Sequence, residues 1–419
     1  MLGYVAAAAA YVLIVSWAVT AGHWQSTGHW HGSFGQVLLP RINDVIVFTF
    51  FLVCGASVGS FLNVVVWRMP QGMGVNGHSF CPQCRNMLRV RDNVPLFGWL
   101  WLGGRCRDCR LPISSRYPVV EAAVGLSFAV LGTVELYGWN LPYRDGAGSY
   151  AMASPLIEGG QLIVVVYHLI GLAIAWAMGL IRYDGHRIPG RLVGFSAVVL
   201  IGGILLFPSL AVVPWQLATL SNETGNTLFS GRSPGAVSFP GIDFWPPADG
   251  VIFLGMLTDA NVLVQSLVRV LAALVAAGFF ARVLARAFCP TADLKLDPLG
   301  KSTVRLIDLV KLIAVIAILI GWQASSGVLI AASVVACVGA RVFKNTDAMG
   351  RFSLALPVAL LIQIVFWRWL SESGWWPGER ASRGVLLSFC LATLFVPLWL
   401  REPRPILVDA APPDEHSGG

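Results

Sequence analysis

Long apolar segments, separated by short polar ones, recur along the whole of this chain. A helix needs about 20 apolar residues to cross the hydrocarbon layer of a bilayer. The alternation of apolar and polar residues that is typical of membrane β-barrels does not appear. The pattern predicts an all-α polytopic membrane protein with about 8–10 transmembrane helices. The expected spans are residues 2–21, 44–67, 117–137, 161–181, 188–207, 263–284, 306–322, 324–341, 352–370 and 382–400.

Composition agrees with this interpretation, because 56% of the residues are hydrophobic and only 12% are charged. Ordinary soluble domains carry about 25% charged residues. The segments 138–160 and 208–262 are rich in Gly, Pro and Ser and are expected to be loops or insertions outside the membrane. The predicted organisation is an extra N-terminal helix and outside loop (1–43), an N-terminal region (44–136) with a cysteine-containing loop (68–116), a membrane bundle (161–370) containing the 208–262 insertion, and an extra C-terminal helix and tail (371–419).

Basic residues indicate the orientation of the chain in the membrane. The segment from Arg68 to Arg116 contains eight arginines and two acids, Asp92 and Asp108. Loops rich in Arg and Lys remain on the cytoplasmic side. We therefore expect an integral protein of the bacterial inner membrane with this loop in the cytoplasm. The net charge of +7 is explained by this asymmetry and needs no nucleic-acid partner.

The same loop carries four cysteines as two Cys-x-x-Cys pairs, Cys81 with Cys84 and Cys106 with Cys109. Two such pairs supply four thiolates for one tetrahedral metal ion, which suits zinc. Disulfides are not expected to persist on the cytoplasmic side. The spacing therefore predicts a closed, structural zinc site, with redox use or a vestigial site as the alternatives.

Several stretches together resemble the bacterial prepilin peptidases, which are type IV leader peptidases of the A24 type. They are "GASVGSFLNVVVWRMP" (55–70), "CPQC", "RDNVPLFGWLWLGGRCRDC" and "LPISSRYPVVEAAVGLSF". The stretches 311–340 and 350–361 resemble the C-terminal helices of that family. The first span, both outside insertions and the last span have no counterpart that we recognise.

The resemblance implies a membrane aspartic endopeptidase that removes the leader of prepilin or pseudopilin substrates at the cytoplasmic face. Many members also N-methylate the new terminus with S-adenosylmethionine. The hydrolysis uses two aspartates near helix ends, which share one proton and one water because two adjacent carboxylates do not both ionise easily. The alternative for this chain is a catalytically inactive homologue that acts as a membrane scaffold or prepilin-binding component.

This alternative arises because both catalytic motifs depart from the family pattern. Asp184 in "IRYDGHRIPGRL" matches a second acid of many members, whereas Arg182 occupies the usual catalytic position. Asp308 in "RLID" lies one residue from the second expected position, and the glycines of that motif are absent. Asp293 in "PTADLKLD" is the runner-up for the second aspartate. One residue on a helix is a rotation of about 100°.

Each acid also has a structural interpretation. Asp184 could pair with a neighbouring arginine, and Asp308 could stabilise a helix N-terminus. Glu121 matches a family position in "RYPVVE" and could contact substrate or the methyl donor, or simply begin a helix.

Overall fold

The computed structural model describes residues 2–27, 34–81, 83–137, 140, 159–207, 210, 260–341, 347–378 and 381–400. Over these residues the protein is helical and contains no strand. Nearly all of the two expected insertions, 138–160 and 208–262, and the tail beyond residue 400 lie outside the described residues.

The helices follow the predicted apolar segments. The long helices are α1 (Leu2–Thr27), α2 (Phe34–Arg68), α4 (Arg116–Leu136), α5 (Gly159–Tyr183), α6 (Gly190–Leu206), α8 (Ala260–Phe288), α9 (Lys301–Gly339) and α10 (Ala348–Val365). The shorter ones are α3 (Phe97–Trp101), α11 (Trp367–Glu372), α12 (Arg383–Thr393) and α13 (Val396–Leu400), with 3₁₀ turns η1 (Met69–Gln71) and η2 (Val90–Asp92).

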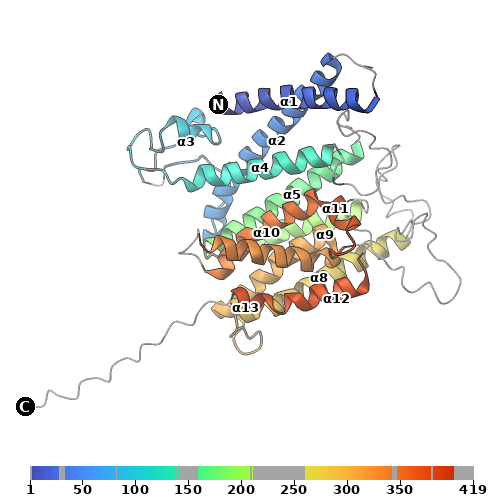
Figure 1. Cartoon of the computed structure of the whole chain (residues 1–419). Coiled ribbons are helices and arrows are strands. Elements are labelled where there is room, and N and C mark those ends of the chain that lie inside the picture. Colours follow the sequence, from blue (N-terminus) through green and yellow to red (C-terminus); the bar gives the residue numbers. More distant parts are fainter. Residues whose placement is uncertain are drawn as a thin grey trace, which may run out of the picture.

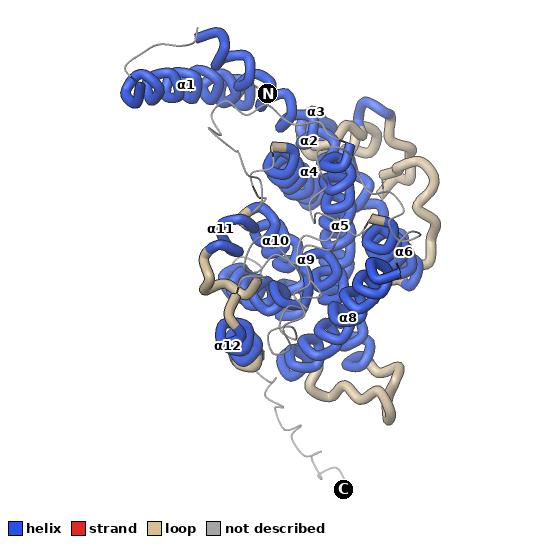
Figure 2. The backbone as a smooth tube through the Cα atoms, turned by 90° about the vertical axis from the view of Figure 1, so that its right-hand side faces the viewer, coloured by secondary structure: helices blue, strands red, loops and turns tan. Residues whose placement is uncertain are grey.

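The long helices lie side by side, with the cysteine-containing loop and α3 at one end of the bundle (Figure 1). Helix α9 packs against α8, α10, α5 and α6, and it runs through the middle of this group in the view along the helices (Figure 2). Helices α2 and α4 form a second closely packed unit that joins the group through α5 and α10. The apolar side chains of both units form one continuous core.

Among the residues that the structure describes, seven helices are long and apolar enough to cross a membrane: Gly3–Ala21, Val37–Gln71, Arg116–Leu136, Leu162–Tyr183, Ser266–Phe288, Ala348–Val365 and Arg383–Leu400. Helix α6 is apolar but shorter than these seven, because it begins only after Pro189, which caps its N-terminus. The structure therefore confirms a helical polytopic membrane protein, with spans that differ in detail from the ten expected ones.

The expected spans 306–322 and 324–341 correspond to the two helical segments that make up the stretch α9. The stretch is interrupted at Gly321, where φ is 80° and ψ is 160°. A residue with a Cβ adopts this backbone conformation only at a cost, so glycine is the natural residue at the break. The two helical segments thus meet within two residues of the predicted boundary. The expected span 352–370 is likewise divided, since α10 ends at Val365 and α11 begins at Trp367.

Glycines bring α2 and α4 into close contact. A Cβ added to Gly59 would lie 2.8 Å from the Cα of Glu121, and one added to Gly55 would lie 2.5 Å from the Cβ of Phe128. Gly55 and Gly59 are four residues apart, so they share one face of α2. Small residues at this spacing let the backbones of membrane helices approach each other.

Replacing Gly59 with leucine is expected to lower the thermal unfolding temperature in detergent, because α4 backbone occupies the space that the side chain needs. Overpacking of this kind costs about 1–3 kcal/mol. Ser57→Leu is the matched control, since Ser57 lies on the exposed side of the same helix turn. Equal unfolding temperatures for the two variants would contradict the close helix contact.

Candidate functional site

The four loop cysteines lie in two turns with the same backbone geometry. In the first, Cys81 N donates to Asn86 O at 2.9 Å and Arg85 N donates to Cys81 O at 2.8 Å. In the second, Cys106 N donates to Leu111 O at 2.9 Å and Arg110 N donates to Cys106 O at 3.0 Å. Arg85 and Arg110, which directly follow the second cysteine of each pair, both have φ of 61°. Each turn therefore folds its two thiols back toward a common point.

The two turns bring the four sulfur atoms together, as the spacing predicted. The Sγ atoms of Cys81, Cys84, Cys106 and Cys109 all lie within 4.8 Å of one another. Four sulfurs around a zinc ion at about 2.3 Å would be separated by roughly 3.8 Å. The Cys81–Cys109 separation is 3.9 Å. This cluster could hold a metal ion.

The backbone also favours the thiolate form that a metal requires. The backbone N–H groups of Cys109 and Asp108 donate to the Cys106 sulfur, with Cys109 having the larger effect. These hydrogen bonds lower the pKa of the Cys106 thiol to about 7, although burial opposes the shift. Metals bind deprotonated cysteine. The pKa of the Cys109 thiol is instead raised to about 11, although the backbone N–H of Leu111 lowers it, because burial and the other three thiols outweigh that bond. The fit to a divalent ion with four sulfur ligands therefore rests on the donor set and its geometry.

One ion pair stabilises the cysteine loop internally, and hydrogen bonds to α2 and α4 attach the loop to the membrane helices. The Arg107 guanidinium binds Asp92 through two hydrogen bonds of 2.7 and 2.5 Å, and this ion pair lowers the pKa of the Asp92 carboxyl. The Arg68 guanidinium, at the end of α2, donates to the carbonyls of Asn76 and His78 at 3.0 and 2.9 Å. The Leu96 N–H donates to Glu121 Oε2 on α4 at 2.7 Å.

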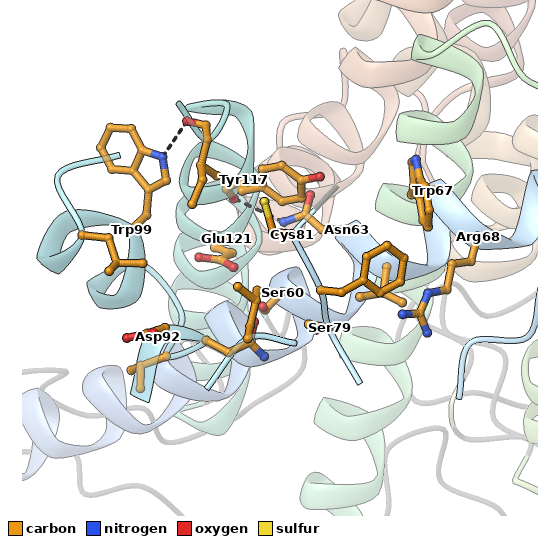
Figure 3. Close-up of a pocket in the computed structure, with 17 residues that line it drawn as sticks. Ser60, Asn63, Trp67, Arg68, Ser79, Cys81, Asp92, Trp99, Tyr117 and Glu121 are labelled. Carbon is orange, nitrogen blue, oxygen red and sulfur yellow. Dashed lines mark hydrogen bonds between the residues drawn. The ribbon is translucent and has the colours of Figure 1, made fainter. Parts of the chain in front are cut away.

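A cavity of about 160 Å³ separates this loop from α2 and α4 (Figure 3). Its wall includes Ser60 and Asn63 of α2, Tyr117 and Glu121 of α4, and Trp99 of α3. The sequence allowed either a functional or a structural role for Glu121. In the structure Glu121 lines the cavity and also anchors the loop by accepting the N–H of Leu96.

Asp308 is fully buried, with 0% of its surface exposed. Its carboxylate lies 2.9 Å from the Lys311 ammonium and 3.7 Å from the Arg182 guanidinium. It also accepts the backbone N–H of Ile188 at 3.3 and 3.4 Å. Lys311 in turn donates to the Ile188 carbonyl at 3.2 Å. Asp308 therefore binds two cations and fixes the segment between α5 and α6.

The other two candidate aspartates have separate partners. Asp184 binds the Arg116 guanidinium at 2.7 Å. Asp293 accepts the backbone N–H groups of Leu296 and Lys295, and these bonds hold the pKa of its carboxyl below its usual range. Among the described residues, Asp184 and Asp308 pair with different cations, and the Asp293 carboxylate accepts backbone N–H groups. The structure brings Asp308 together with Arg182, the residue in the usual aspartate position.

Sequence reasoning missed a second buried polar group inside the bundle. Glu135 of α4 and His168 of α5 are 3% and 1% exposed, and His168 Nδ1 lies 2.5 Å from Glu135 Oε1. Asn140 lies beside them and donates to the Ile364 carbonyl at 3.2 Å. An acid inside an apolar segment is the signal that could have found the pair, because such residues almost always face the bundle interior.

Comparison with known proteins agrees with the observed cysteine loop and its supporting helices. The family model of the bacterial peptidase A24 N-terminal domain matches residues 53–134. An Escherichia coli protein named type 4 prepilin-like proteins leader peptide-processing enzyme is 36% identical over 167 residues, covering 34% of this chain and 62% of that protein. No solved structure matches.

Two further relatives carry the name prepilin leader peptidase/N-methyltransferase. The Myxococcus xanthus protein is 36% identical over 167 residues, covering 38% of this chain and 48% of the relative. The Klebsiella pneumoniae protein is 35% identical over 192 residues, covering 42% of this chain and 76% of the relative. The chain thus spans between about half and three quarters of the length of these relatives. With 35% identity across 76% of the Klebsiella protein, this chain belongs to the family of prepilin leader peptidases/N-methyltransferases.

Proposed function

We propose that this chain binds prepilin or pseudopilin proteins at the cytoplasmic face of the bacterial inner membrane without cleaving their leader. The relatives, which are named for prepilin processing, support the substrate class. The contact of Asp308 with Arg182 and Lys311 is the observation that supports the absence of cleavage. The chain would then be a prepilin-binding or scaffold component of the assembly that uses these proteins.

The surroundings of the Asp308 carboxyl differ from those that an aspartic peptidase needs. An aspartic peptidase needs two carboxylates that share one proton, so that one acts as base and the other as acid. Asp308 instead lies beside two cations, Lys311 at 2.9 Å and Arg182 at 3.7 Å. Asp184 has its own cation in Arg116. Among the described residues each of these carboxylates is paired with a cation, Asp184 with Arg116 and Asp308 with Arg182 and Lys311.

The second candidate function is the leader peptidase, with Asp184 and either Asp308 or Asp293 as its catalytic pair. One observation favours it besides the names of the relatives. Asp308 accepts the N–H of Ile188, only four residues after Asp184, so the two acids belong to neighbouring parts of the structure.

The N-terminal half has a proposed role that does not depend on the aspartates. The four cysteines would hold a structural zinc ion, which would stabilise the loop beside the cavity. If the chain shares the N-methyltransferase activity in the names of its relatives, S-adenosylmethionine is the expected methyl donor and the cavity beside Glu121 is the candidate place for it.

Co-expression with a prepilin-like protein, in cells lacking another leader peptidase, tests the proposal. We expect the two proteins to purify together and the leader to remain, as measured by the mass of the partner. Arg182→Asp would place a second carboxylate facing Asp308 and is expected to introduce leader removal. Arg182→Asn is the control that removes the cation without adding an acid.

Two outcomes would contradict the proposal. Leader removal by the unmodified chain, lost in Asp184→Asn or Asp308→Asn, would establish the peptidase instead. Failure of the two proteins to purify together would reject prepilin binding.

A further inference from the structure

A groove of about 610 Å³ lies between the end of α8 and the C-terminal helices. Its residues on α8 include Phe279, Arg282, Val283 and Arg286, and Leu394 forms the opposite side. Leu394 lies in the short connection between α12 and α13, both of which pack on α8. Leu394 thus belongs to the last expected span, 382–400.

Two arginines give the groove a positive charge. Arg282 and Arg286 are one helical turn apart, so they share a face of α8, and both are exposed. No hydrogen bond or ion pair of either side chain occurs among the described residues. Asp293 is near enough for Arg282 to affect its pKa, but its carboxylate accepts the N–H groups of Lys295 and Leu296. Both guanidinium groups are therefore available to an anion.

The depth of the groove in the membrane indicates what kind of anion it would meet. Both arginines lie in the last turns of the apolar segment Ser266–Phe288, where long basic side chains reach the headgroup layer. Phe279 is about one turn deeper and is 53% exposed, and Leu394 is 37% exposed. The groove thus combines a cationic end with an apolar wall directed toward the acyl chains.

We propose that this groove binds an anionic phospholipid, with the phosphodiester at Arg282 and Arg286 and an acyl chain along Phe279 and Leu394. Guanidinium groups match phosphate in geometry and form charge-assisted hydrogen bonds with it. Basic pockets between membrane helices are known sites of anionic headgroups. The lipid would join α8 to the C-terminal helices. This inference is independent of the presence or absence of peptidase activity.

Native mass spectrometry of the full chain in detergent, titrated with phosphatidylglycerol or phosphatidylcholine, tests this site. We expect phosphatidylglycerol to be retained in preference to phosphatidylcholine. Replacing both arginines (Arg282→Gln with Arg286→Gln) should weaken phosphatidylglycerol binding roughly 30-fold, given the usual contribution of two basic residues near a membrane surface. Leu394→Trp keeps both charges but narrows the groove, and it should also reduce retention.

The matched control is Arg187→Gln with Arg191→Gln, which removes two exposed arginines at the same spacing near the start of α6. This pair should leave lipid retention unchanged. If both double variants lost phosphatidylglycerol retention equally, the lipid would be held by general attraction to the positive end of the protein, and the proposed site would be wrong. Unchanged binding in the α8 variant would overturn it, and so would equal retention of the two lipids or equally tight binding of soluble glycerol phosphate.

Discussion

Replacing Asp308 with alanine is expected to destabilise the protein by about 3–5 kcal/mol, as breaking a buried ion pair usually does. The substitution leaves the Arg182 guanidinium, which is 4% exposed, without its carboxylate. It also removes the acceptor of the Ile188 N–H. The measurement is reversible unfolding in detergent, followed by circular dichroism.

A triple variant separates the ion pair from the rest of the site. Arg182→Met and Lys311→Met together with Asp308→Leu remove all three charges and keep similar volume. Most of the lost stability should then return, because well-packed apolar residues often replace a buried ion pair without cost. Asp293→Ala is the control and should cost less than about 1 kcal/mol, because its partly exposed carboxylate bonds only neighbouring backbone.

The stability of the Asp308→Ala variant also distinguishes the prepilin-binding scaffold from the peptidase. Replacing a residue that stabilises the fold lowers the free energy of unfolding, whereas a catalytic acid held in place by its surroundings can often be replaced with little loss of stability. If Asp308→Ala unfolds like the unmodified chain, Asp308 is not the centre of a structural ion pair. The peptidase would then be the better explanation of its burial.

Replacing Cys81 with serine is expected to abolish metal binding at the cysteine loop. The purified chain should contain about one zinc ion, and the variant none, by elemental analysis. Structural zinc contributes about 10–16 kcal/mol in small zinc peptides, so the loop should also become sensitive to proteolysis between residues 72 and 115. The membrane helices should keep their helicity, because their core is formed by the apolar clusters of the bundle.

Cys54→Ser is the matched control, since Cys54 lies in α2 and not in the cluster. Acidification or a strong chelator should reproduce the effect of Cys81→Ser, because protons compete with the metal for the thiolates. A metal content unaffected by Cys81→Ser would reject the zinc site.

Local sequence patterns predicted much of the fold because the forces concerned act over short stretches of chain. Apolar segments of about 20 residues become helices in a membrane wherever they occur, since no other hydrogen-bonding partner exists for their backbone. The two Cys-x-x-Cys turns could be predicted for the same reason, because the geometry of each depends on the residues within it. Helix ends were less certain, as the division of the segment 352–370 between α10 and α11 shows.

The aspartates could not be assigned in this way. Their role depends on which side chains from distant helices meet them, and a displacement of one residue turns a helical side chain by about 100°. The motif identified Arg182 as a departure, but only the packing of α5 against α9 reveals that this arginine binds Asp308. Asp184 is likewise paired with Arg116, which is 68 residues away in the chain.

The sequence by itself therefore determined that this protein is a helical membrane protein with a four-cysteine loop, because hydrophobicity and short spacings fix these features locally. The tertiary structure alone decided which charges face each other: Asp308 with Arg182 and Lys311, Asp184 with Arg116, and Glu135 with His168. The physical reason is that a buried charge is stable only beside a partner, and that partner is selected by how the helices pack.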